Sequence, residues 1–412
     1  MRSHDSLDND GDRRHSTRRL LMFRSLLLFV AFGSLAVWMG CAPAAPPPRA
    51  VDIAAADGVV LKGTLFAAAR RGPAVLLLHQ CDDQRTVWDP LGIRLAAAGI
   101  TALSIDYRGY GESGGTPHDQ LANAELASMM STVWPRDIDA AFAFLGRQPG
   151  VTMARVGAGG GSCGVNNAVQ LARRHGNVRA LALLAGPADR DGRLFLEGPA
   201  APPVLAAAAA DDRYADFVAI MSWLFGVSHS PESRLAQYPD GGHAAIIFRT
   251  HPDLADTITL WFAAVLADAP GAVPVTNGVP LAPAILEELH AIDRQGGAAA
   301  ALARRADTGA GASAGPRVPE YFVNQLGYEH MMMKDYPTAI DLMKLNAALY
   351  PASPNTMDSL GDVYLAAGDI ASALAAAKQT LVLLDRDTLD TAQRKADLRR
   401  AAEDKIARLS TR

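Results

Sequence analysis

The sequence is poor in cysteine, carries little net charge and has no basic block outside its N-terminal leader. It contains 3 cysteines among 412 residues, and no group of cysteine and histidine residues has the spacing of metal ligands. The formal net charge is −4, so the charge pattern does not indicate a nucleic-acid partner. We expect no metal, no organic cofactor and no nucleic acid. Hydrophobic residues make up 49% of the chain, which is long enough to fold as two domains.

The N-terminus resembles a bacterial lipoprotein signal. Arginines precede an apolar stretch, Ser25–Gly40, that is too short to span a bilayer comfortably, and Cys41 ends it. The pattern predicts cleavage of residues 1–41 before Cys41 and lipidation of that cysteine, although Trp38 stands where leucine is usual. An uncleaved membrane anchor is the alternative, and the leader also resembles a twin-arginine export signal. Either way we expect an exported protein, anchored to a membrane of the cell envelope, with the Pro/Ala-rich residues 42–50 as a stiff tether.

A G-x-S-x-G pattern spans residues 160–164, between an expected strand at 154–158 and an expected helix at 165–172. A serine at that point must turn sharply, and Gly160 and Gly164 leave room for the turn. The turn lifts the Ser162 hydroxyl out of the sheet and aims the N–H of Cys163 at a substrate oxyanion. The pentapeptide alone is equally compatible with a turn that binds phosphate or has no chemical role.

Two further segments fit a serine hydrolase. An apolar run of strand length, 73–78, ends in His79-Gln80-Cys81. An oxyanion hole needs a second backbone N–H from the loop after such a strand, which indicates Gln80 or Cys81. The next expected strand, 101–105, leads into Asp106–Ser113, which fits D-x-R-G-x-G-x-S.

Together these motifs resemble the α/β-hydrolase superfamily, and within it the dienelactone hydrolases and serine esterases. The resemblance covers about Val51–Asp268, and residues 51–268 are the expected hydrolase domain. It implies an α/β fold with a doubly wound, mostly parallel sheet. Most members have His-Gly where this chain has His79-Gln80. The motifs are specific to the superfamily and do not name a substrate.

A serine hydroxyl needs a base, and the base needs an orienting carboxylate. The order in the superfamily is serine, acid, histidine, with the acid in the turn after a strand, here expected at 203–210. The usual spacing selects Asp212, with Asp211 as the competitor. Asp240-Gly241-Gly242-His243 resembles the family's histidine loop, so His243 is the expected base. Four other histidines are expected to be surface or capping residues: His118, His175, His229 and His251.

Cys81 and Cys163 remain once Cys41 is assigned to lipid, and each falls next to a proposed oxyanion position. A disulfide between them is one alternative in an oxidising compartment, but we expect two free, partly buried thiols. Cysteine is the nucleophile in some members of the superfamily. Cys163 in that role would put Val165 where a small residue is needed, so Ser162 is preferred.

The segment 115–135, which contains Met129 and Met130, either lies over the active site or forms an ordinary amphipathic helix packed on the sheet. The connection between Gly186 and Pro202 is too short for a large cap domain. Residues 252–266 have apolar residues at helical spacing and are expected to form the closing helix of the hydrolase domain.

Beyond residue 268 the composition changes. Residues 269–316 are expected to be a linker with one helix at 282–294 and an Ala/Gly-rich, partly mobile stretch from 296. Gly327 and Gly361 then lie 34 residues apart, as do Ala339 and Ala373. This period resembles tetratricopeptide repeats, so residues 317–412 are expected to form an all-α repeat domain. It would dock on the hydrolase domain or bind a protein partner.

Two functions fit this pattern. The first is an exported, membrane-tethered serine hydrolase that acts on an ester, thioester or amide of a small-molecule or peptide acyl substrate. The second is an envelope scaffold with an inactive hydrolase fold, whose helical repeats bind a protein. The complete set of Ser162, Asp212 and His243 favours the first.

Overall fold

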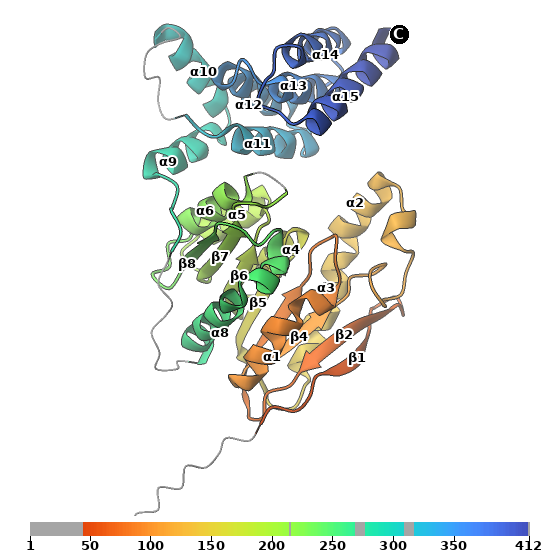
Figure 1. Cartoon of the computed structure of the whole chain (residues 1–412), viewed down its shortest axis with the longest axis vertical. Helices are drawn as coiled ribbons and strands as arrows, with labels where there is room; N and C mark the ends of the chain where they lie inside the picture. Colours follow the sequence, from red (N-terminus) through yellow and green to blue (C-terminus); the bar gives the residue numbers. More distant parts are fainter. Residues whose placement is uncertain (1–43, 214–215, 268–276, 309–316, 411–412) are drawn as a thin grey trace, which may run out of the picture. The chain divides into compact units, whose positions relative to one another are not determined.

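The structure is a computed structural model that describes residues 44–213, 216–267, 277–308 and 317–410 (Figure 1). The predicted signal sequence 1–41, with Cys41, lies outside the described residues. So do the first residues of the predicted tether and two parts of the predicted linker, 269–276 and 309–316. Among the described residues, no helix combines the length and apolarity needed to cross a bilayer.

In the part of the chain that the structure describes, eight strands form one sheet in the order β1-β2-β4-β3-β5-β6-β7-β8. The strands are β1 (Arg49–Ala54), β2 (Val60–Phe66), β3 (Gly72–Leu78), β4 (Thr101–Ile105), β5 (Val151–Gly161), β6 (Val178–Leu184), β7 (Val204–Ala209) and β8 (Arg234–Tyr238). β2 is antiparallel to both of its neighbours, β1 and β4. The other six strands, β4, β3, β5, β6, β7 and β8 in sheet order, run parallel to one another.

Helices cover both faces of this sheet. They are α1 (Asp89–Ala97), α2 (Asn123–Thr132), α3 (Trp134–Gly146), α4 (Cys163–Arg174), α5 (Arg190–Glu197), α6 (Phe217–Val227), α7 (Ile247–Thr250) and α8 (Pro252–Ala267). α1 and α8 pack together on one face, while α3 and α4 pack on the other (Figure 1). This arrangement confirms the predicted doubly wound, mostly parallel α/β-hydrolase fold.

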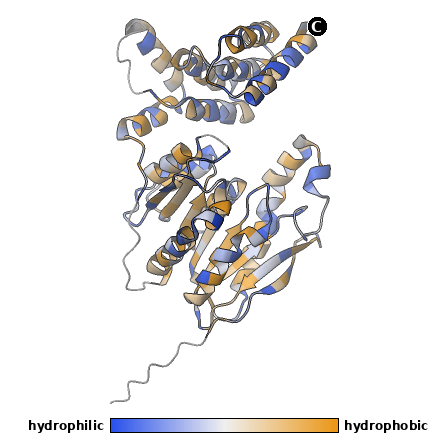
Figure 2. Cartoon of the chain, viewed as in Figure 1, coloured by the Kyte–Doolittle hydropathy of each residue, from blue (hydrophilic) through white to orange (hydrophobic). Residues whose placement is uncertain are grey.

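Strands β3 and β7 are apolar along their whole length, because helices bury both of their faces. Residues 74–78 of β3 and 204–208 of β7 have no exposed surface, and the apolar colouring of the central sheet is visible in Figure 2. Since β3, β5, β7 and β8 are parallel, the loops that follow them lie at one edge of the sheet. Ligands of doubly wound sheets bind at that edge.

The C-terminal part of the chain is helical, as predicted. Its helices are α9 (Pro283–Ile292), α10 (Gly297–Thr308), α11 (Glu320–Met332), α12 (Tyr336–Leu349), α13 (Pro354–Ala366), α14 (Ile370–Leu384) and α15 (Ala392–Ser410). The expectation of one helix in residues 269–316 is wrong, because α10 follows α9 there. Alanine is the best helix former, and Ala298 and Ala301 are buried.

The 34-residue spacing is visible in the helix caps. Asp335 begins α12 by accepting a hydrogen bond from the N–H of Thr338, and Asp369 does the same for α14 with the N–H of Ser372. Gly327 lies where a Cβ would come within 2.6 Å of Met343, so α11 and α12 pack closely. The second helices of the two pairs, α12 and α14, therefore begin at equivalent positions.

Contacts between described residues join the C-terminal helices to the α/β part of the chain, and an ion pair and a ring contact are among them. The guanidinium of Arg193, in α5, makes two hydrogen bonds to the carboxylate of Glu329, in α11, at 2.8 and 2.6 Å. The ring of Trp223, in α6, lies 4.9 Å from that of Phe322. Trp223 and Phe322 are both buried.

Candidate active site

Ser162 lies in a sharp turn between β5 and α4. Its φ is 52° and its ψ is −119°, a backbone conformation that residues with a side chain seldom adopt. The N–H of Ser162 donates to the carbonyl of Leu184 at 2.9 Å, and the carbonyl of Ser162 accepts from the N–H of Val165 at 2.9 Å. The turn is thus held from both sides, as the G-x-S-x-G pattern predicts.

Three glycines make this turn possible. A Cβ on Gly160 would lie 2.0 Å from the carbonyl oxygen of Gly164, and one on Gly164 would lie 2.3 Å from that of Leu78. Gly186, which follows β6, was considered from the sequence only as the start of a connection and not as part of this turn. A Cβ there would lie 2.1 Å from the carbonyl oxygen of Ser162. No side chain fits at any of these three positions without moving the backbone.

His243 and Asp212 form a buried pair. Nδ1 of His243 lies 2.8 Å from Oδ2 of Asp212, and each side chain is only 3% exposed. A carboxylate can only accept here, so Nδ1 carries the proton and Nε2 is the ring nitrogen that can accept one. The ring of Phe217 packs 5.3 Å from that of His243. The hydrogen bond to Asp212 thus fixes the imidazole in the ring orientation that a general base needs.

Asp211 has a different partner. Its Oδ1 accepts a hydrogen bond from the backbone N–H of Gly242 at 2.8 Å. Gly241 and Gly242 both have positive φ, 127° and 74°, which explains the glycines before the histidine. Asp211 therefore holds the backbone of the histidine loop, while Asp212 contacts the ring itself.

The histidine loop packs directly against the serine turn. A Cβ on Gly161, the residue before Ser162, would lie 3.3 Å from the Cβ of Ala244, the residue after His243. Arg213, next to Asp212, forms an ion pair with Asp82 in the loop after β3. The loops that follow β3, β5, β7 and β8 thus meet, and they bring together the residues predicted from sequence.

Gln80 is more than a backbone donor. Its side chain has no exposed surface. Oε1 accepts from the N–H of Ala245 at 3.1 Å, and Nε2 donates to the carbonyl of His243 at 3.5 Å. Sequence reasoning considered only the main chain of Gln80. The sequence did offer a clue to this side-chain role, because Gln80 stands where the resemblance to the α/β hydrolases leads one to expect glycine.

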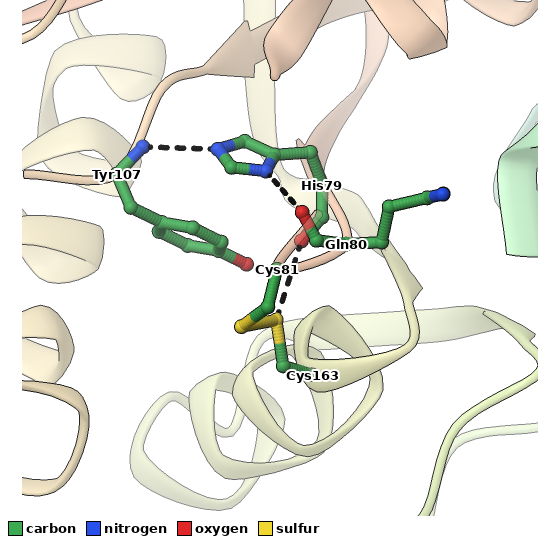
Figure 3. Close-up of a disulfide and its surroundings, with 5 residues drawn as sticks. All are labelled: His79, Gln80, Cys81, Tyr107 and Cys163. Carbon is green, nitrogen blue, oxygen red and sulfur yellow. Dashed lines mark hydrogen bonds between the residues drawn. A yellow bond between two sulfur atoms is a disulfide. The ribbon is translucent and has the colours of Figure 1, made fainter. Parts of the chain in front are cut away.

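The backbone donors of the proposed oxyanion hole are positioned by their surroundings. Cys163 is the first residue of α4, so its N–H has no partner inside the helix and lies at the positive end of the helix dipole. On the opposite side of the proposed oxyanion hole, in the loop after β3, two hydrogen bonds hold His79. Its Nε2 accepts from the N–H of Tyr107 at 3.2 Å, and its Nδ1 lies 2.7 Å from the carbonyl of Gln80 (Figure 3).

His79 therefore orients the Gln80–Cys81 peptide. Burial lowers the pKa of His79 to about 4, so the ring is neutral near pH 7. Because Nε2 accepts from Tyr107, Nδ1 carries the proton and donates to the carbonyl of Gln80. In a trans peptide the N–H points opposite to the C=O. The N–H of Cys81 is thus directed away from His79, and of the two predicted donors Cys81 is the better fixed.

A disulfide joins Cys81 to Cys163, with the two Cα atoms 5.8 Å apart (Figure 3). The expectation of two free thiols is wrong. Each cysteine lies three residues beyond the β3–β5 pair Leu78–Gly160, and that strand neighbourhood brings them within bonding range. In this oxidised form Cys163 has no thiol, which leaves Ser162 as the nucleophile candidate of this turn.

The D-x-R-G-x-G-x-S segment forms the loop after β4, and its charged residues hold that loop to neighbouring segments. Asp106 is buried, and it accepts from the N–H of Arg85 at 2.7 Å and pairs with the Arg85 guanidinium. Arg108 pairs with Asp57 and Asp137, and these carboxylates raise its pKa. The segment therefore acts structurally.

Three of the other histidines have partners of their own. His118 stacks on Tyr110 with ring centres 3.8 Å apart. His175 lies 2.9 Å from Asp139, and His251 lies 2.6 Å from Asp240. His229 is exposed in the loop before β8. Among the described residues, no group of three His, Cys, Asp or Glu side chains could hold a metal ion.

The segment 115–135 folds as a short turn of helix and α2. It borders a cavity of about 600 Å³ whose lining includes Arg108, Leu121, Met129 and Val133. Of the described residues that line this cavity, none is Ser162, Asp212 or His243. Trp134 is fully buried in the core, and no residue in the described part 124–132 of α2 is fully buried. α2 packs against α3 and leaves an open apolar hollow beside it.

No protein-family model matches the chain. It is similar to an uncharacterized protein of Mycobacterium tuberculosis, with 33% identity over 113 residues, or 26% of this chain and 40% of that protein. It is also similar to thiohydrolase apmlB of Arthrinium phaeospermum, with 30% identity over 107 residues, or 26% of this chain and 32% of that protein. The chain thus spans less than half the length of these curated relatives.

Solved structures with a similar backbone fold include α/β hydrolase GrgF from Penicillium sp. sh18. It matches 54% of this chain and 100% of its own, with 16% identity and a TM-score of 0.44. The esterase Pf2001 of Pyrococcus furiosus matches 53% of this chain and 93% of its own, with 17% identity and a TM-score of 0.41. No conclusion about substrate follows from either likeness.

Proposed function

We propose that the protein is an exported, membrane-tethered serine hydrolase that cleaves an ester, thioester or amide through an acyl-enzyme on Ser162. The observation that carries the proposal is the buried pair of His243 and Asp212, 2.8 Å apart, in a loop packed against the serine turn. A turn of this kind and an oriented imidazole are the two parts that nucleophilic catalysis by serine requires.

The reaction follows from this geometry. Oγ of Ser162 attacks the substrate carbonyl carbon while Nε2 of His243 takes its proton, and Asp212 stabilises the imidazolium through Nδ1. The N–H groups of Cys163 and the Gln80–Cys81 turn stabilise the oxyanion. His243 then protonates the leaving group. Water deprotonated by His243 attacks the acyl-enzyme, releases the acid and restores Ser162. No metal or organic cofactor takes part.

Export and tethering rest on the lipoprotein-like leader and Cys41. The Cys81–Cys163 disulfide supports the same proposal, because such bonds persist in oxidising compartments such as the bacterial periplasm. Replacing Cys41 with serine should release the protein from membranes or leave it unprocessed. Unchanged membrane fractionation with an unchanged mature N-terminus would favour an uncleaved anchor instead.

The C-terminal helices are proposed to be tetratricopeptide-like repeats whose concave face binds a protein. The 34-residue spacing of the capping residues Asp335 and Asp369 supports this proposal. The contacts of Glu329 and Phe322 with the α/β part are compatible with a docked arrangement of the repeats.

A fluorophosphonate probe tests the function directly. The full-length protein should be labelled on Ser162, and Ser162→Ala should lose both the label and about 10⁴-fold or more of kcat while staying folded. A panel of p-nitrophenyl esters, acyl thioesters and aminoacyl amides then ranks the substrate classes; the thioesters are included because one relative is named a thiohydrolase. A folded wild-type protein with no label and no turnover would favour the inactive scaffold.

A further inference from the structure

The disulfide joins the two residues that carry the best-placed oxyanion donors. Cys163 offers the first free N–H of α4, and Cys81 offers the N–H of the peptide that His79 orients. Their Cα atoms lie 5.8 Å apart, and Figure 3 shows the bond between the loop after β3 and the start of α4. The covalent link therefore runs between the two sides of the hole.

The sheet itself does not depend on this bond for its pairing. β3 and β5 are already hydrogen-bonded in parallel register from Ala74–Val156 to Leu78–Gly160. The bond lies three residues past the last pair on each strand, where the strands have ended. It constrains the loops, and these loops carry the proposed catalytic donors.

Each donor is also held on its own side. α4 orients the N–H of Cys163, and the hydrogen bond from His79 Nδ1 to the carbonyl of Gln80, at 2.7 Å, orients that of Cys81. Neither restraint fixes the distance from one donor to the other. The disulfide adds that restraint, and an oxyanion needs both donors within hydrogen-bond range at once.

We propose that the Cys81–Cys163 disulfide is a positioning element that holds the two oxyanion donors in register, so that turnover depends on the oxidised bond. The inference rests on the proposed function. A displacement of about 1 Å at a catalytic group can cost on the order of 100-fold in rate. We therefore expect loss of the bond to lower kcat by about 10- to 100-fold, with little change in KM.

The bond is accessible to a small reductant, since Cys81 and Cys163 are both only partly buried. Dithiothreitol supplies two electrons and two protons, the S–S bond breaks to give two thiols, and the reagent closes to its own cyclic disulfide. Oxidised glutathione reverses the exchange.

The donors are backbone groups, so alanine substitution removes the link and keeps both N–H groups. The test compares the wild type with Cys81→Ala/Cys163→Ala. It measures kcat and KM for the best ester and Ki for a trifluoromethyl ketone, whose adduct with Ser162 places an oxyanion in the hole. We expect kcat to fall and the ketone Ki to rise by a similar factor. Dithiothreitol should reproduce the loss in the wild type and leave the double variant unchanged.

Thermal melting and circular dichroism establish that each form is folded at the assay temperature, and peptide mass analysis establishes the state of the bond. If the double variant does not fold, the same ratios are measured on folded wild type before and after reduction. An unchanged kcat and ketone Ki with the bond broken would overturn the inference and leave only a stabilising role. Failure of the oxidised wild type to react with fluorophosphonate would instead reject the proposed function.

Discussion

Gln80 donates a hydrogen bond from Nε2 to the backbone carbonyl of His243 at 3.5 Å, across 163 residues of sequence. Its Oε1 accepts from the N–H of Ala245 at 3.1 Å. One buried amide thus spans the loop that carries the proposed base, and the backbone of the same residue belongs to the oxyanion loop. Two loops with different catalytic tasks are held in register by a single side chain.

Replacing Gln80 with Met should therefore impair catalysis. The change keeps the side-chain volume but leaves the N–H of Ala245 without its acceptor, which costs about 1–3 kcal/mol of unfolding free energy. We expect kcat to fall by about 10-fold because the His243 loop loosens. Urea unfolding and ester kinetics measure the two effects. The matched control is Gln84→Met, at an exposed position in the same loop; equal effects at both sites would refute this role of Gln80.

The two neighbouring aspartates should respond very differently to amide substitution. Asp212→Asn removes the charge that orients and stabilises His243, so kcat should fall by about 10³- to 10⁴-fold. Asp211→Asn keeps an oxygen that can accept from the N–H of Gly242, and its effect should stay under about 10-fold. Steady-state kinetics decide the ranking. The opposite order would move the proposed acid to Asp211.

Alanine at Gly160 should prevent formation of the serine turn, because its Cβ would lie 2.0 Å from a backbone oxygen. We expect an insoluble protein, or a folded one that has lost at least about 100-fold in kcat/KM. Gly176→Ala is the control, since a Cβ there meets nothing within 4 Å. Expression yield, thermal melting and fluorophosphonate labelling provide the readouts, and normal labelling of Gly160→Ala would contradict the expectation.

His79 should make the fold sensitive to acid. Burial lowers its pKa from 6.5 to about 4, so between those values the unfolded chain binds a proton that the folded protein does not. The free energy of unfolding is therefore highest above pH 6.5. It falls by about 3 kcal/mol in total as the pH drops towards 4, because protonation favours the unfolded chain. Denaturant unfolding of the wild type and His79→Asn at several pH values isolates this contribution. Parallel pH profiles for the two proteins would show that His79 is not responsible.

A chain that ends at Ala267 should still hydrolyse a small activated ester, since every proposed catalytic group precedes His251. It should be less soluble, because Trp223 and Arg193 lose their contacts with Phe322 and Glu329. The comparison is kcat/KM for a p-nitrophenyl ester, with size-exclusion chromatography of both chains. A monodisperse, folded truncation without activity would mean that the C-terminal helices complete the active site.

The strands were largely predictable from the sequence, because buried parallel strands appear as uninterrupted apolar runs. The strand expected at 101–105 is β4, Thr101–Ile105, and the one expected at 73–78 is β3, Gly72–Leu78. The pairing of His243 with an aspartate after β7 could be anticipated from the order of motifs. The choice between Asp211 and Asp212 rested on spacing alone, and the structure places Asp212 against the ring.

Contacts across the chain were less predictable. Whether Cys81 and Cys163 bond depends on β3 and β5 being neighbours in space, which two half-buried cysteines do not reveal by themselves. The clamp formed by Gln80 depends on the reach of a side chain and on the path of the histidine loop. Helix α10 was not predicted because the glycines of this Ala/Gly-rich stretch suggested mobility. Its alanines favour a helix instead.

The glycines around Ser162 also define where this scaffold can be redesigned. A Cβ at Gly160, Gly164 or Gly186 would clash with a backbone oxygen, so we expect most members of a mutant library at these positions to be inactive. Helix α2 is the opposite case, since none of its described side chains, 124–132, is fully buried and it borders an open, largely apolar hollow of about 600 Å³. Substitutions are best started at this helix, with the serine turn left untouched, because side chains there can change without displacing the backbone of the site.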